Sequence, residues 1–290
     1  MTQHKYFLQY AMVLAMLLWA AGWSALKILT EHVSFEVLTF WRFAIMFVAF
    51  IPILFYFKKP ILIPQKSFKY IFGGALLNIL FMVLAFFGVL YGSAGAGGVI
   101  ITTISPIMTF GLVIWFYKKR LVRNQFLGLF LGALGGIVML NLTGGGLSQL
   151  LEGGNVYYLL SALTWAFVTI MSQKSHLHIH PIHYSFAIAG VALCIVFIAT
   201  WNVDLTVVFD QSFSFWIALL YLGIFGQTVA TTIFFIASGK LGSGAASSYM
   251  FLVPVFAPLM SFFLLGEALE IHIMMGGFLT LFAVYLINKK

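Results

Sequence analysis

The stretch from Gly92 to Leu121, GSAGAGGVIITTISPIMTFGLVIWFYKKRL, is echoed by LGSGAASSYMFLVPVFAPLMSFFLLGEAL, which runs from Leu241 to Leu269. Each copy leads from small residues through an apolar stretch to a central proline and then into a second apolar stretch. An internal repeat indicates architecture more strongly than any single residue does. The chain is therefore predicted to be a duplication, with repeats at residues 1–145 and 146–290.

The composition indicates that most of the chain lies in lipid. Hydrophobic residues make up 62% of it and charged residues 8%, and the mean hydropathy is +1.07. A helix needs about 20 apolar residues to cross the roughly 30 Å of a bilayer's hydrocarbon core. The charge-free runs predict an all-α integral membrane protein with ten transmembrane helices, near residues 6–26, 36–57, 68–90, 94–117, 124–142, 155–173, 182–201, 214–236, 243–265 and 270–287.

The basic residues predict the orientation, because Lys and Arg accumulate in cytoplasmic loops. With both termini in the cytoplasm, every basic residue except Lys27 and Arg42 falls on the cytoplasmic side. All seven acidic residues then fall on external loops or helix ends. The net charge of +8 thus reflects membrane topology, and nucleic-acid binding is not expected.

Five spans in each half is an odd number, so the second repeat must enter the membrane from the opposite side. Inverted repeats give two nearly equivalent packings, one open to each side of the membrane, around a site near the midplane. This geometry favours alternating access.

Several strings resemble one family. They are the second copy of the repeat, LLWAAGWSALK at residues 17–27, TFWRFAI at 39–45, YGSAGAGGVI at 91–100 and LTWAF at 163–167. Along its whole length the chain is similar to the ten-helix EamA type of the drug/metabolite transporter superfamily. The resemblance implies a secondary transporter of the cytoplasmic membrane whose partners are a small-molecule substrate and the lipid bilayer. It is compatible with a homodimer.

Polar side chains at mid-depth are the first candidates for substrate binding, because each is costly in lipid and usually faces a cavity or a partner helix. Asn78 and Gln227 lie halfway along the third and eighth spans and are expected to face each other. Alternatively, each amide bonds a nearby backbone carbonyl. Thr102 is a weaker candidate, since a hydroxyl can bond its own helix.

Aromatic side chains are the second set of candidates. Trp19 and Trp165 occupy equivalent points of the first and sixth spans, and Tyr249 lies on the ninth. Aromatic walls offer apolar area, cation–π attraction and a polar tip. The resemblance adds Trp23 and Tyr91. Interfacial anchoring is the alternative for all of them.

Pro106 and Pro254 are interpreted as kinks or hinges, because proline removes a backbone donor and weakens a helix locally. Simple packing is the alternative. A second packing feature is the ridge formed by Gly128, Gly132 and Gly136 on the fifth span, which favours close helix contact inside the protein over a dimer interface.

Arg42 lies about six residues into the second span. Its guanidinium could bind a substrate carboxylate in a bidentate contact. The alternatives are structural pairing with Glu36 or Glu31 and capping of the carbonyls of a kinked neighbouring helix. No Asp or Glu is expected at mid-depth, so a proton relay built on a buried carboxylate is not predicted.

Other chemistry finds little support in the sequence. The spacing from His176 to His183 suits a pH-responsive loop better than a metal site, and the single Cys194 excludes a disulfide within the chain. Motifs of metalloproteases, P-loops and hydrolases are absent, so neither an enzyme nor a cofactor is expected. The favoured function is amino-acid export or facilitation. Purines, sugars and cationic drugs remain alternatives, as do a channel and a non-transport receptor.

Overall fold

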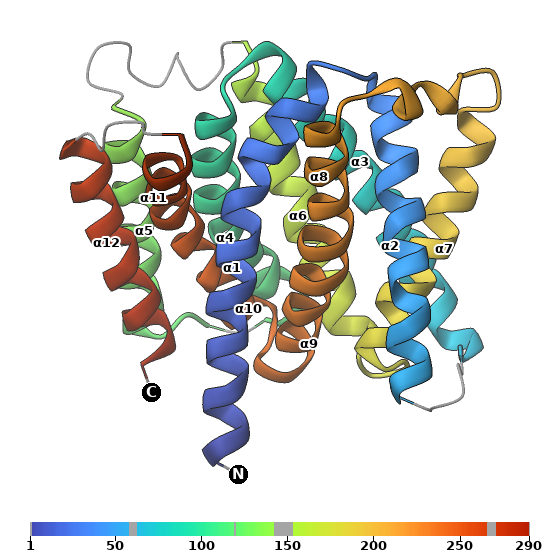
Figure 1. Ribbon diagram of the computed structural model, residues 1–290. Helices are drawn as coiled ribbons and strands as arrows, with labels where there is room; N and C mark the ends of the chain where they lie inside the picture. The colour runs from blue at the N-terminus through green and yellow to red at the C-terminus, as the bar shows by residue number, and fades with distance from the viewer. Residues whose placement is uncertain (1, 58–62, 119, 142–152, 266–270, 290) are drawn as a thin grey trace.

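The computed structural model describes residues 2–57, 63–118, 120–141, 153–265 and 271–289. Within these ranges all regular structure is helical (Figure 1). The main helices are α1 (Thr2–Thr30), α2 (Phe35–Phe57), α3 (Phe68–Tyr91), α4 (Ala94–Tyr117), α5 (Arg123–Met139), α6 (Asn155–Ser175), α7 (Pro181–Ala199), α8 (Phe213–Leu220), α9 (Thr231–Leu241), α10 (Ser243–Ser248), α11 (Val253–Leu265) and α12 (Ile271–Asn288).

The helices account for the ten predicted spans. Nine segments of the described chain are long and apolar enough to cross a membrane. The tenth is α5, which is shorter, at 17 residues, and packs along α12 at one edge of the bundle. Both termini lie at the same end of the bundle in Figure 1. The prediction of an all-α membrane protein is confirmed, and the boundary expected at residue 145 lies outside the described residues.

Two spans of the second repeat are irregular. Between α8 and α9 the segment η4 (Tyr221–Ala230) is a π-helix, and between α10 and α11 the segment η5 (Tyr249–Leu252) is a 3₁₀-helix. The η5 segment ends just before Pro254, whereas α4 runs unbroken through Pro106. The two repeats therefore treat their central prolines differently, and only the second copy changes its helix type there.

The outer surface and the interior differ as expected for a protein in lipid. Large apolar side chains such as Trp115 and Phe278 are more than 70% exposed on the outside of the bundle. Such a surface is stable against hydrocarbon but not against water. Inside, side chains at 0–2% exposure fill the bundle in two clusters. One contains Met12, Met16, Phe50, Tyr184, Phe234 and Phe235, and the other contains Leu29, Tyr158, Phe215 and Leu219.

The glycine ridge of α5 packs inside the molecule. Its three glycines, Gly128, Gly132 and Gly136, face Ile287 of α12, Phe251 of η5 and Thr103 of α4, respectively. A β-carbon at any of the three would overlap these neighbours. The ridge thus allows close helix contact inside the protein, as expected from the sequence.

Candidate functional site

A cavity of about 90 Å³ lies between the two repeats. Helices α1, α2, α3 and α4 of the first repeat line it, together with α6, η4, α9 and η5 of the second. Its residues sit near the middle of their spans or in the half where α1 ends and α2 begins. Buried side chains pack in both halves of the bundle around the cavity.

One wall of the cavity is polar. The Nη2 of Arg42 donates a hydrogen bond to Oε1 of Gln227 at 3.2 Å. The arginine side chain is 9% exposed, and its buried Nε has no hydrogen-bond partner. Arg42 forms no ion pair with any residue of the described chain, Glu31 and Glu36 included. The interpretation that it pairs with one of these two acids is therefore wrong.

The π-helix η4 positions Gln227. In a π-helix the backbone turns are wider than in an α-helix, and such segments are frequent at functional sites. Two threonine hydroxyls donate to backbone carbonyls five residues earlier in the sequence. Thr228 donates to the carbonyl of Gly223 at 2.8 Å, and Thr231 donates to that of Gly226 at 3.2 Å. Gln227 lies between these two bonds, which hold its backbone beside Arg42.

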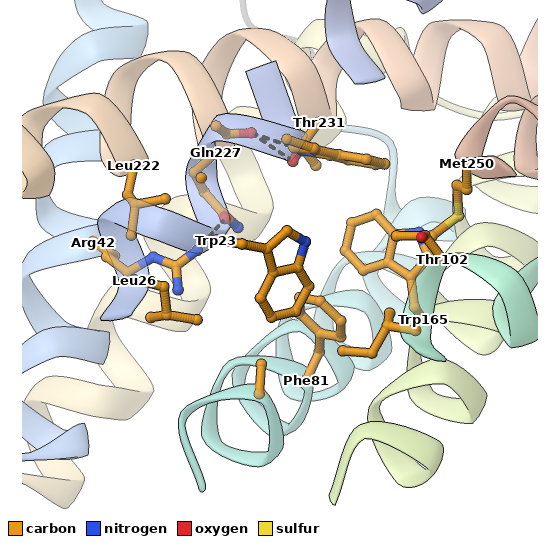
Figure 2. Close-up of a pocket in the computed structure, with 15 residues that line it drawn as sticks. Trp23, Leu26, Arg42, Phe81, Thr102, Trp165, Leu222, Gln227, Thr231 and Met250 are labelled. Atoms are coloured by element: carbon orange, nitrogen blue, oxygen red, sulfur yellow. Dashed lines mark hydrogen bonds between the residues drawn. The ribbon is translucent and has the colours of Figure 1, made fainter. Parts of the chain in front are cut away.

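The other walls are aromatic. Trp19 and Trp165 meet edge to face with centroids 5.1 Å apart, and Phe81 lies 4.8 Å from Trp165. Figure 2 shows Trp23 and Phe81 between the Arg42–Gln227 side of the cavity and the side formed by Thr102, Trp165 and Met250. The indole nitrogen of Trp165 is buried without a partner. The cavity thus combines apolar area with donors that no group of the described chain satisfies.

The structure brings together five of the residues singled out from the sequence as binding residues or charge partner. They are Trp19, Arg42, Thr102, Trp165 and Gln227, and Trp23 joins them. The hydroxyl of Thr102 bonds the carbonyl of Gly98 in its own helix, so its oxygen reaches the cavity only as an acceptor.

Other candidates lie elsewhere. Asn78 does not line the cavity, because it is 1% exposed and its amide donates to the carbonyl of Gly74 at 2.8 Å. Asn78 therefore does not face Gln227 across the cavity as predicted. Its amide bonds a backbone carbonyl, which was the alternative interpretation. Tyr249 is buried behind the wall, and its neighbour Met250 lines the cavity instead. Tyr91 is 59% exposed and stacks on Phe87.

Neither proline lines the cavity, and several lining residues had not been singled out. These are Gly22, Leu26, Phe81, Ala85, Ile101, Leu222, Gly226, Thr231 and Met250. On α1 a signal was present, because Trp19, Gly22, Trp23 and Leu26 follow the spacing of one helix face. On η4 no such signal existed, since a π-helix breaks the regular periodicity.

No cluster of three or more metal-ligating side chains occurs in the described part of the chain. The loop predicted from His176 to His183 is shorter in the structure, because His183 already lies in α7. Within the loop, His178 stacks on Tyr70 with ring centroids 5.6 Å apart. This contact ties the loop to the start of α3 and gives it a packing role.

A bundle of membrane-spanning helices built from two repeats around a central cavity is the architecture of a secondary transporter. The chain belongs to the EamA-like transporter family, whose sequence pattern matches residues 8–141 and again residues 153–289. The duplication read from the two proline-centred stretches is thereby confirmed, as is the membership of the drug/metabolite transporter superfamily.

Individual relatives carry the same general description. An uncharacterized transporter of Archaeoglobus fulgidus is 26% identical over 96% of both chains. One from Synechocystis is 30% identical over 68% of this chain and 64% of its own length. The chain spans 48% of a WAT1-related chloroplastic protein of Arabidopsis thaliana, at 29% identity. A crystal structure of another protein aligns with a TM-score of 0.70 over 97% of this chain and 95% of its own, at 16% identity, which supports the fold alone.

Proposed function

We propose that this transporter moves small amphipathic metabolites, amino acids first among them, outward across the cytoplasmic membrane. The observation that carries the proposal is the pairing of a polar wall, Arg42 with Gln227, and aromatic walls around one cavity between the repeats. An amphipathic solute can satisfy both kinds of wall at once. The distribution of Lys and Arg supports a cytoplasmic location for both termini in this proposal.

Alternating access is the proposed mechanism. Rocking of the two repeats against each other would open the cavity to each side of the membrane in turn. The irregular segments η4 and η5 are the proposed points of flexure.

Coupling through the solute itself, or facilitated diffusion, fits the cavity best. Its lining residues include no Asp or Glu, and a membrane proton relay usually depends on such a group. An imposed pH gradient should therefore have little effect on exchange.

Counterflow in proteoliposomes tests the proposal. Vesicles preloaded with unlabelled amino acids, purines or sugars would be mixed with the labelled compound outside. Saturable accumulation of label identifies a carrier and its substrate class, because an open pore does not exchange. Trp165→Phe should slow exchange without unfolding the protein, and Trp115→Phe on the lipid-facing surface is the matched control. Flux that unlabelled solute does not accelerate would assign the protein to the channels.

A further inference from the structure

We propose that Arg42 is the recognition group for a carboxylate, so that the cavity selects small monocarboxylates with an apolar body over amines and neutral amides. The inference rests on the proposed function, because it names the solute class of the same cavity. It goes further in one respect: the carboxylate is required, and the ammonium group of an amino acid is not.

The guanidinium has unused donors. Arginine carries five N–H groups in a planar fork that matches the two oxygens of a carboxylate. In this structure one hydrogen bond, to Gln227, is formed at 3.2 Å, and the buried Nε is without a partner. A buried donor that bonds nothing is costly. A carboxylate arriving from the cavity would satisfy the fork.

The charge is uncompensated as well. Arginine stays protonated at neutral pH, Arg42 is 9% exposed, and no acidic residue lines the cavity around it. A charge buried in a membrane protein without a counter-ion is strongly unfavourable and usually marks a substrate path. Gln227 supplies a dipole but no negative charge. A bound anion would neutralise the site, whereas a bound cation would add repulsion.

An ammonium group finds no comparable partner. It would meet the hydroxyl oxygen of Thr102 and the faces of Trp19, Trp23 and Trp165. Neutral acceptors and cation–π contacts are weaker than a charge-assisted bidentate hydrogen bond. The apolar body is better placed there. In Figure 2 Trp23 and Phe81 lie between Arg42 and the far wall, where the free indole N–H of Trp165 offers one more donor. The cavity is thus rich in donors and lacks acidic groups.

Three probes of one shape test the selectivity: 4-methylpentanoate, 4-methylpentanamide and 4-methylpentylamine. Binding of each to the full chain would be measured by calorimetry in phosphatidylcholine nanodiscs at pH 7. The carboxylate should bind at least about tenfold more tightly than the amide, since charge-assisted bonds to arginine are roughly twice as strong as neutral ones. The amine should bind most weakly. Equal binding of all three probes, or tighter binding of the amine, overturns the proposal.

The decisive variant retains the arginine. Gln227→Glu is nearly isosteric and places a carboxylate where Oε1 now accepts from Arg42, so the site is occupied from within. Affinity for the carboxylate probe should fall about tenfold or more, with the amide unaffected. Arg42→Gln should have the same effect and Arg42→Lys a partial one, because lysine lacks the planar fork. Arg123→Gln, which removes an exposed arginine, is the control. Unchanged selectivity in Gln227→Glu contradicts the assignment even if Arg42→Gln does not fold.

An anionic lipid headgroup could present similar chemistry, so the titration is repeated with phosphatidylglycerol in the nanodiscs. Unchanged carboxylate affinity supports a solute site. Loss of affinity in proportion to that lipid assigns Arg42 to the headgroup and overturns the proposal. The two proposals fail separately: counterflow without carboxylate preference refutes only this inference, whereas selective binding without counterflow refutes transport.

Discussion

Trp19 of the first repeat donates its indole N–H to the backbone carbonyl of Gly226 in the second, 207 positions away in the sequence, at 3.1 Å. The same carbonyl accepts from Thr231 at 3.2 Å. It belongs to the π-helix η4. One residue therefore both lines the cavity and ties α1 to the irregular helix that carries Gln227.

Replacing Trp19 with Phe keeps an aromatic ring and removes this donor. We expect a loss of about 1 kcal/mol in the free energy of unfolding, because the carbonyl of Gly226 keeps Thr231 as a partner. Exchange should slow more than stability suggests, since η4 is no longer tied to α1. Detergent melting together with counterflow measures both effects. If exchange and stability stay at their wild-type values, the hydrogen bond has no role in either.

Buried hydroxyls link α6 to α9. Ser172 donates to the hydroxyl of Ser238 at 2.9 Å, and Ser238 donates to the carbonyl of Thr169 at 3.0 Å. Ser238→Ala should cost about 1–3 kcal/mol, because it leaves buried groups of α6 with fewer partners. Chemical denaturation in mixed micelles would measure the change. The control is Ser214→Ala at an exposed position, which should have little effect.

The sequence predicted the fold better than the site. The charge-free runs locate the spans, because a membrane helix needs about 20 apolar residues. The spans must be helical, because the bilayer core has no water to bond the backbone groups. The cavity tryptophans were identifiable because the two repeats carry them at equivalent positions. The partner of Asn78 was not identifiable, since an amide at mid-depth fits a cavity or a carbonyl of its own helix equally well. The pairing of Arg42 with Gln227 depends on η4, and no residue pattern in that segment indicates a π-helix.

Asn78 provides a direct check of that correction. Because its amide bonds Gly74 of the same helix, Asn78→Ala should leave the exchange rate per folded molecule unchanged while lowering the melting temperature slightly. Trp165→Phe should show the reverse pattern. Counterflow normalised to folded protein, measured alongside melting, distinguishes the two. A strong loss of exchange in Asn78→Ala would return this residue to the transport pathway.

Asp204 gives the clearest pH dependence outside the membrane spans. Hydrogen bonds from the hydroxyl and then from the backbone N–H of Thr206 hold the pKa of this carboxyl below its ordinary value. A lowered folded-state pKa stabilises the protein above the unfolded value of about 3.9, and the contribution is lost as the pH falls through the folded pKa. The melting temperatures of wild type and Asp204→Ala should therefore differ at pH 6, and the difference should shrink as the pH falls below the unfolded value of about 3.9. A constant difference across this range would show that the charge is not responsible.

Gly132 of α5 tests the close packing between the repeats. Glycine in a helix interior is about 1 kcal/mol less favourable than alanine, so Gly132→Ala would stabilise an open helix face. Here the added β-carbon would overlap the ring of Phe251, which is 0% exposed in η5 and has no room to move. Overpacking costs about 1–3 kcal/mol, so the net effect should be destabilising. Gly111→Ala on α4 is the matched control, because no atom lies within 4 Å of its added carbon, and it should be neutral or stabilising. Adding Phe251→Leu to Gly132→Ala should recover part of the loss. If both glycine variants melt alike, α5 does not approach η5 this closely in the membrane.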